Sequence, residues 1–299
     1  MTSRSKWWGW VLAAPPLLVI AIFIVVPISF GVAYTLGYSG GPNRIISLIA
    51  QHQYLSEGSG PTIGAYQDVF SSQLFWRSFS VTIIVAVVAT VVVMVLAWTI
   101  ALYLRFKAGR AGQVLSGLVI VPMFIPVVIG SYAMLAFYGT DGFVRTVAAL
   151  AGWEDAPAFG YTVAGIVIGS VWTSLPFAVL MVTSGLSSVP DALIESAQDV
   201  GASAVRRFFS VLLPMALLPT VIAATFTAIN ILGSFTLPYI VGPSAPNMLG
   251  VLMSDTYQAF NQPQQAEVMA VVVFVLASFA SVPYLWANFR SAKSSGAFK

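Results

Sequence analysis

Three carboxylates spaced four residues apart mark the polar stretch of this chain with the clearest potential to act on another molecule. Asp191, Glu195 and Asp199 fall at positions i, i+4 and i+8, so they share one face of a helix. Apolar residues such as Ile194 and Val200 lie mostly toward another side. A thin amphipathic helix can insert into a groove on a partner, where its carboxylates meet arginine or lysine. A solvated loop helix is an equally good interpretation of this spacing alone.

The ends of this polar helix carry recognisable signals. Ser188 is suited to the N-cap, Pro190 to the first turn and Asp191 to a capping box. Gly201 stands where a left-handed C-terminal cap is wanted. Small side chains keep the helix and its turn slim: Ser196, Ala197, Ala202, Ser203 and Ala204.

Catalytic groups are scarce in the rest of the chain. There is no cysteine and one histidine, His52, so thiolate chemistry and an H-E-x-x-H zinc site are excluded. We interpret His52 as an ordinary surface residue of a polar loop. No G-x-x-x-x-G-K-[ST] loop is present, so the chain does not bind ATP by that route. Neither a metal nor a cofactor is expected in this chain, and any chemistry is expected from a partner.

The composition indicates a membrane protein. Hydrophobic residues make up 58% of the 299 residues and charged residues 8%, compared with about 25% charged in an ordinary soluble domain. The mean hydropathy is +0.89. Apolar runs of 18 or more residues recur, and each is long enough to cross the bilayer as a helix. We therefore predict an all-α polytopic membrane protein, with residues 1–299 forming a single transmembrane domain.

We predict six transmembrane helices with a polar hairpin between the fourth and the fifth. The first apolar run superficially resembles a signal peptide, but its length and Pro15 and Pro16 favour an uncleaved span. Prolines in the third and fifth spans are expected to kink these helices. The spans are 9–36, 76–104, 114–138, 161–186, 212–239 and 266–288, and the hairpin is 187–211.

The basic residues predict the orientation. Ten of the thirteen fall on the side that holds both termini and the hairpin, which places that side in the cytoplasm. The other three are Arg44, Arg77 and Arg145. The net charge of +3 therefore reflects membrane orientation and does not indicate nucleic-acid binding. The ten are Arg4, Lys6, Arg105, Lys107, Arg110, Arg206, Arg207, Arg290, Lys293 and Lys299.

Polar residues within the spans are candidates for a translocation pathway. Asn230, Ser234 and Thr236 in the fifth span are costly at membrane depth unless they have partners. They line a central cavity or bridge neighbouring helices, and the sequence favours neither. Ser131 and Tyr132 in the third span are further candidates. No carboxylate lies in the middle of a span, which argues against an ion-coupled carrier.

The hairpin also resembles a known motif. Its spacing is similar to the EAA motif of ABC importer permeases, E-A-A-x3-G-x9-I-x-L-P. The matching residues are Glu195-Ser196-Ala197, then Gly201 after three intervening residues, then Val211-Leu212-Leu213-Pro214 after nine more. Ser196 and Val211 are mild departures. The motif lies between the fourth and fifth spans, as in these permeases, so the resemblance covers most of the chain and implies the type I permease fold.

The resemblance implies a permease subunit in the plasma membrane of a prokaryote. It implies a second permease, two cytoplasmic ATPases that use ATP and Mg²⁺, and an external substrate-binding protein. The hairpin would dock on the ATPase as a coupling helix, and Pro214 would position the return into the membrane. Arg206 and Arg207 are interpreted first as membrane anchors. The residues expected to couple to the ATPase are Glu195, Ser196, Ala197, Asp199, Gly201, Ala202 and Pro214.

The substrate is predicted less directly. Asp199-Val-Gly-Ala-Ser203 resembles permeases for polyamines, ferric iron and organophosphonates, and we favour that group. Trp172, Pro176-Phe177 and Tyr257-Gln-Ala-Phe260 resemble sugar permeases, which remain the alternative. The absence of an intramembrane carboxylate argues against a polyamine. From other classes, an ion-coupled secondary transporter and a membrane scaffold without transport activity stay open as hypotheses.

Overall fold

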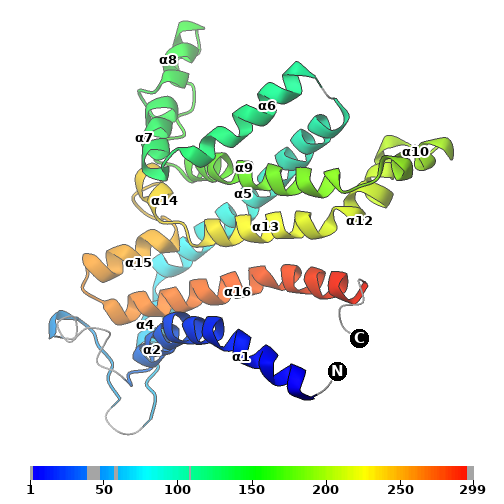
Figure 1. Ribbon diagram of the computed structural model, residues 1–299. Helices are drawn as coiled ribbons and strands as arrows, with labels where there is room; N and C mark the ends of the chain where they lie inside the picture. Colours follow the sequence, from blue (N-terminus) through cyan, green and yellow to red (C-terminus); the bar gives the residue numbers. More distant parts are fainter. Residues whose placement is uncertain (1–2, 39–47, 57–59, 108, 295–299) are drawn as a thin grey trace. The chain divides into compact units, whose positions relative to one another are not determined.

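The computed structural model describes residues 3–38, 48–56, 60–107 and 109–294, with side chains described from residue 10 to residue 290 (Figure 1). All regular elements in this part of the chain are helices, as predicted. Residues 45–50 are described only from residue 48, and Arg44 and Lys299 of the orientation count lie outside the described residues. The helices are α1 Ser3–Ile20, η1 Ala21–Val25, α2 Val26–Thr35, α4 Gly64–Ser71, α5 Gln73–Phe106, α6 Arg110–Ile120, η2 Val121–Phe124, α7 Val127–Tyr138, α8 Phe143–Leu150, α9 Val163–Ser187, α10 Asp191–Asp199, α11 Ala204–Arg207, η3 Phe208–Leu212, α12 Leu213–Met215, α13 Leu217–Leu232, α14 Thr236–Val241, α15 Leu249–Gln258 and α16 Pro263–Ser294.

Five stretches of the described chain are long and apolar enough to cross a membrane. A sixth is obtained if the two segments Ala204–Met215 and Leu217–Leu232, which meet at 76°, form one bent span. A total of five or six such stretches agrees with the predicted multi-pass fold. The five are Trp10–Thr35, Gln73–Phe106, Val127–Leu150, Val163–Ser187 and Pro263–Arg290.

The predicted third span, 114–138, is divided at Pro126, one of the two prolines expected to kink it. The chain leaves the helical conformation at Ile125 (φ −95°, ψ 120°) and Pro126 (ψ 134°), between α6–η2 and α7. Proline has no N–H to donate and excludes the helical conformation of the residue before it, so Pro126 explains the break. The membrane-length stretch instead begins at Val127 and includes α8.

The predicted fifth span, 212–239, is also divided. The expected kink is present as the 76° bend at Ala216, between Pro214 and Pro219. A second break at residues 233–235 was not predicted, and it separates α13 from the short α14. Gly233 ends α13, and its backbone N–H still bonds to Ile229 O at 3.1 Å. The span is therefore a bent helix followed by a separate turn of helix.

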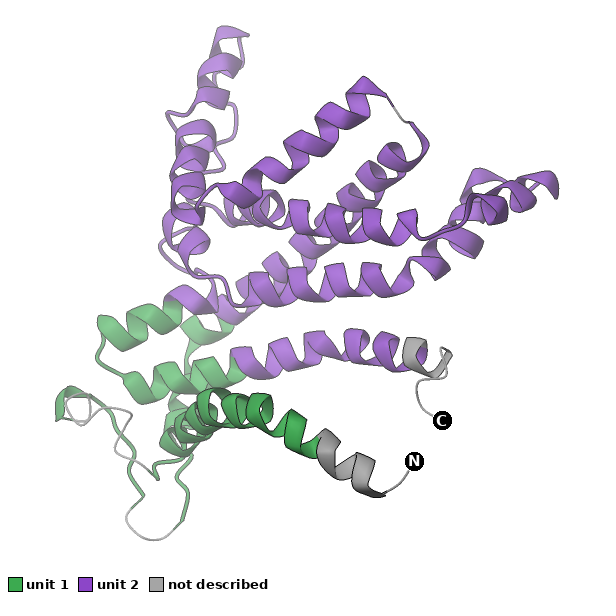
Figure 2. Ribbon diagram, viewed as in Figure 1, with its two compact units in different colours: residues 1–76, 252–272 green, residues 77–251, 273–299 purple. Residues whose placement is uncertain are grey.

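The chain divides into two compact units, which Figure 2 colours separately. In the larger unit, residues 77–251 and 273–299, α9 is the central helix and packs against α13, α14, α6 and α7. Gly169 of α9 allows a close approach, because a Cβ there would lie 2.7 Å from Leu237 Cδ1 of α14. Gly165 and Gly169 of α9 form a G-x-x-x-G pattern, and the close approach at Gly169 is the helix packing that such a pattern allows.

The smaller unit comprises residues 1–76 and 252–272. Its loop segment is held by Gln264, a fully buried residue of α16. The Gln264 amide accepts a hydrogen bond from Tyr54 N (2.8 Å) and donates to Tyr34 O (2.9 Å) and Tyr54 O (3.0 Å). The Tyr54 hydroxyl donates to Asp68 Oδ2 at 2.8 Å, and this hydrogen bond to a carboxylate raises the pKa of Tyr54.

Candidate functional site

The polar hairpin folds as a short helix with a tight C-terminal turn. Helix α10 ends at Asp199, and Gly201 follows with φ +75°. Ala202 N donates to Ala197 O (3.0 Å) and Gly201 N donates to Gln198 O (2.8 Å). These two bonds form a Schellman motif, which satisfies carbonyls at the helix end. The predicted left-handed cap at Gly201 is present in the structure.

The start of α10 differs from the prediction. Ser188 is not the N-cap: its hydroxyl donates to Gly185 O of the preceding helix at 2.7 Å, and Pro190 occupies the cap without a side-chain bond. Asp191 instead accepts a hydrogen bond from Arg105 Nη2 at the end of α5, at 2.5 Å. Arg105 Nη2 also donates to Val189 O at 3.1 Å. The hairpin is therefore tied to α5 by a long-range contact that local sequence signals do not reveal.

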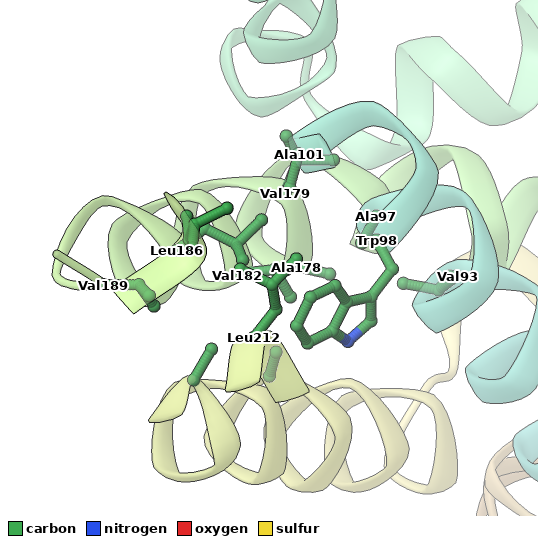
Figure 3. Packing of buried hydrophobic residues seen from close by; sticks show 13 residues of the cluster. Val93, Ala97, Trp98, Ala101, Ala178, Val179, Val182, Leu186, Val189 and Leu212 are labelled. Carbon is green, nitrogen blue, oxygen red and sulfur yellow. The ribbon is translucent and has the colours of Figure 1, made fainter. Parts of the chain in front are cut away.

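One face of the hairpin is fastened to the transmembrane helices. Ile194 is 5% exposed and Val189 1% exposed, and both join a cluster with residues of α5, α9 and the α12–α13 region (Figure 3). Burial of these side chains removes apolar surface from water and holds α10 against the bundle. The remaining core members are Val93, Ala97, Trp98, Ala101, Ala178, Val179, Val182, Leu186, Leu212, Ala216 and Ala223.

The opposite face is exposed. Glu195 and Asp199 are exposed, and within the described chain neither takes part in an ion pair. Val200 is 84% exposed and Leu193 44% exposed on another side of the hairpin. An exposed hairpin that carries both carboxylates and large apolar groups suits a protein partner better than a solvated loop.

Truncating the buried anchor should loosen the hairpin selectively. Ile194→Ala removes apolar atoms from the core and is expected to cost about 2–5 kcal/mol. Amide hydrogen exchange of residues 189–205 should therefore accelerate relative to the wild type. Leu193→Ala, on the exposed side of the same helix, serves as the matched control and should leave exchange nearly unchanged. Equal protection in the two variants would contradict the anchoring role.

A second candidate site is a cavity of about 220 Å³ between α9 and α13. Two of its hydroxyls, Ser174 Oγ and Thr227 Oγ1, are buried without a hydrogen-bond partner in the described chain. Burying such groups unpaired costs free energy, so they are suited to a polar ligand or water. Among the described residues, no charged side chain lines the cavity. Its lining residues are Thr173, Ser174, Phe177, Phe226, Thr227 and Asn230.

The structure brings one of the five candidate pathway residues to this cavity. Asn230 lines it, whereas Ser234 and Thr236 lie at the break between α13 and α14. Ser131 is 1% exposed and its hydroxyl donates to Val127 O of its own helix at 2.7 Å. Tyr132 is 60% exposed on α7. The hydroxyls of α9 were missed, although Thr173-Ser174 just before Pro176 is a polar signal at membrane depth.

Enzymatic groups do not assemble in the described part of the chain. His52 is exposed, and its Nδ1 lies 3.4 Å from Gln262 Nε2, with no serine hydroxyl bonded to it. No cluster of three or more His, Cys, Asp or Glu side chains in those residues could hold a metal ion. The described residues offer a small polar cavity and an exposed hairpin face.

Five or six apolar stretches of membrane-spanning length, with bends and breaks, are those of a multi-pass membrane protein. Residues 94–293 match the family of binding-protein-dependent transport system inner membrane components, and the chain belongs to this family. It is the permease subunit of an ABC importer, and ATP hydrolysis takes place in a separate subunit. The family membership thus confirms the predicted permease class and replaces the ion-coupled carrier as an explanation.

Two curated relatives and one solved structure illustrate the similarity. The trehalose/maltose transport system permease protein MalF of Thermococcus litoralis is 26% identical, covering 95% of this chain and 96% of its own. The spermidine/putrescine permease PotB of Haemophilus influenzae is 26% identical over 72% of this chain and 78% of its own. A bacterial alginate importer has a TM-score of 0.72 at 16% identity, covering 97% and 96% of the two chains, which shows the fold.

The predicted closeness to polyamine, iron and phosphonate permeases is not confirmed. Relatives of both substrate classes are found, and the trehalose/maltose permease, which covers nearly the whole chain, is named for sugars. The similarity therefore fits the sugar alternative better than the favoured group.

Proposed function

We propose that this chain forms the translocation pathway of an ATP-driven importer for a small, neutral carbohydrate. The observation that carries the proposal is the cavity between α9 and α13, which presents hydroxyl and amide groups and no charge. Phe177 and Phe226 lie beside them, with ring centroids 5.9 Å apart. A hydroxyl-rich solute needs hydrogen-bond partners for its hydroxyls and an apolar surface for its ring faces. Small-molecule sites typically combine apolar and aromatic walls with a few polar groups.

The same cavity is poorly suited to a polyamine. An ammonium group taken out of water needs an opposite charge or several acceptors, and no carboxylate lines this space. Cation–π contact with the phenylalanines offers only partial compensation. A polyamine permease therefore remains the second candidate, supported by the Haemophilus relative.

The proposed assembly follows from the exposed face of the hairpin. Residues 1–299 act as one permease domain beside a second permease, and α10 docks on one of two cytoplasmic ATPases. The contact is made by Glu195, Asp199 and the turn at Gly201. The small side chains of Ser196, Ala197 and Ala202 keep the hairpin slim, and Pro214 directs the chain back into the membrane. An external binding protein delivers the solute. Both termini lie in the cytoplasm, as the positive charges favour.

Removing a polar group of the cavity should weaken uptake of the carbohydrate. Asn230→Leu deletes an amide that can bond sugar hydroxyls, and a lost hydrogen bond of about 1 kcal/mol plus desolvation predicts about a tenfold loss of apparent affinity. Uptake of labelled trehalose, maltose and spermidine is measured in proteoliposomes that contain the complete importer.

Ser131→Ala is the matched control, because Ser131 bonds its own helix away from the cavity. It should leave uptake unchanged. Uptake of spermidine but of neither sugar would overturn the carbohydrate proposal. An equal effect of Ser131→Ala and Asn230→Leu would refute the assignment of the cavity.

A further inference from the structure

Two adjoining hollows lie where the hairpin meets α5. The first has a volume of about 400 Å³ and is lined by residues of α5, α10 and α11–η3. The second, of about 650 Å³, is lined almost entirely by apolar side chains of α5, α11–η3 and α13. They share Leu102, Ala204 and Phe208, so we treat them as one groove.

The first hollow carries a basic group without an acceptor. Arg207 lines it, and the Nε atom of Arg207 is buried with no hydrogen-bond partner in the described residues. The side-chain amide of Gln198, from α10, lines the same hollow. Around them the walls are apolar, with Leu102, Ile194 and Phe208. An unpartnered guanidinium beside an amide donor is complementary to an oxyanion such as phosphate.

The second hollow continues from this basic group along the apolar spans. Its walls include Met94, Val95 and Trp98 of α5 and Ala224 of α13. Trp98 packs edge-on against Phe208, with ring centroids 5.0 Å apart, and its indole projects from α5 into the core cluster (Figure 3). An acyl chain suits such an apolar surface, because the contact removes apolar area from water.

We propose that this groove binds an anionic phospholipid. The headgroup phosphate accepts from Arg207 and Gln198, and one acyl chain lies along Trp98 and the apolar wall. Charge complementarity selects the occupant: basic pockets between transmembrane helices on the cytoplasmic side bind anionic headgroups. Because Gln198 and Ile194 belong to α10, the bound lipid bridges the hairpin to the bundle. The inference rests on the proposed cytoplasmic placement of the hairpin and does not depend on the transported solute.

Quenching by brominated lipid tests the site directly. The full chain is placed in nanodiscs containing dibrominated phosphatidylglycerol or dibrominated phosphatidylcholine. The chain has eight tryptophans, so the signal of Trp98 is taken as the difference from Trp98→Phe. In the wild type, half-maximal quenching of this component is expected at about a tenfold lower mole fraction of the glycerol lipid than of the choline lipid.

Two neighbouring arginines give a matched pair of variants. Arg207→Gln should reduce the tenfold preference to about twofold or less, whereas Arg206→Gln should preserve it, because Arg206 does not line either hollow. Arg207→Lys retains the charge and should keep an intermediate preference. Mass spectrometry of phosphatidylglycerol retained through purification repeats the comparison without altering Trp98.

Several results would overturn the proposal. If Arg206→Gln and Arg207→Gln reduced the preference for the glycerol lipid equally, the lipid would be attracted to a charged surface in general and not to this groove. Displacement of the glycerol lipid by inorganic phosphate would show a free-anion site, because the acyl chain would then contribute nothing. Loss of Trp98 quenching when the complete importer is assembled would show that a protein segment occupies the groove.

Discussion

Reversing the charge of Glu195 is expected to abolish ATP-driven uptake while the chain still inserts into the membrane. The Glu195 carboxylate is exposed on the outward face of α10 and has no ion-pair partner within the described residues. If it meets a basic residue of the ATPase, Glu195→Lys replaces an attraction with a repulsion of several kcal/mol, so uptake should fall about 100-fold or more. Copurification of the ATPase with the tagged chain should fall in parallel.

Glu154→Lys provides the control for this change. It makes the same charge reversal at an exposed position in the loop between α8 and α9, which is expected on the outer side. Uptake should then stay near the wild-type rate. Normal uptake with Glu195→Lys would refute the docking of this face.

Gly201→Val is expected to uncouple ATP hydrolysis from uptake by distorting the turn after α10. With φ at +75°, a β-branched residue is strained by more than the about 1–2 kcal/mol typical of the left-handed region. A Cβ at Gly201 meets no atom within 4 Å, so the strain acts through the backbone and not through packing. The chain should therefore accumulate normally in the membrane, while uptake falls at least tenfold.

Gly201→Asn separates backbone strain from side-chain bulk. Asparagine tolerates the left-handed conformation, so this variant should retain most of the uptake. Uptake and ATP hydrolysis are measured together in proteoliposomes. Equal loss in both variants would contradict the backbone explanation, because it would indicate that any side chain at Gly201 interferes with docking.

The hairpin was the most predictable part of the site. Its carboxylate spacing, slim turn and Gly201 cap are local properties, so one stretch of sequence specifies them. Its attachment to the bundle was not predictable in the same way. The contacts of Arg105 with Asp191 and Val189 connect residues more than eighty positions apart, and the Ser188 hydroxyl bonds back to α9 instead of capping α10.

The spans were predicted by composition, but their breaks required geometry. Hydropathy treats 114–138 and 212–239 as continuous because a helix and a broken helix have the same apolar content. Pro126 and the bend at Ala216 interrupt them, and a further break near Gly233 separates α13 from α14. The cavity was found only in part for the same reason. Asn230 was visible as a polar residue, whereas Ser174 and Thr227 became candidates only once α9 and α13 were placed together.

Helix α9 is long enough that a small tilt at one end displaces its other end by several ångströms. It has 25 residues, so it is about 37 Å long, and the buried cluster clamps the end that leads into the hairpin. A tilt of about 5° around that end shifts the far end by about 3 Å. Ser174 lies near the middle, where the same tilt moves the cavity wall by about half as much. A rotation of a few degrees at the hairpin therefore moves the cavity wall by a distance large enough to form or break a hydrogen bond there.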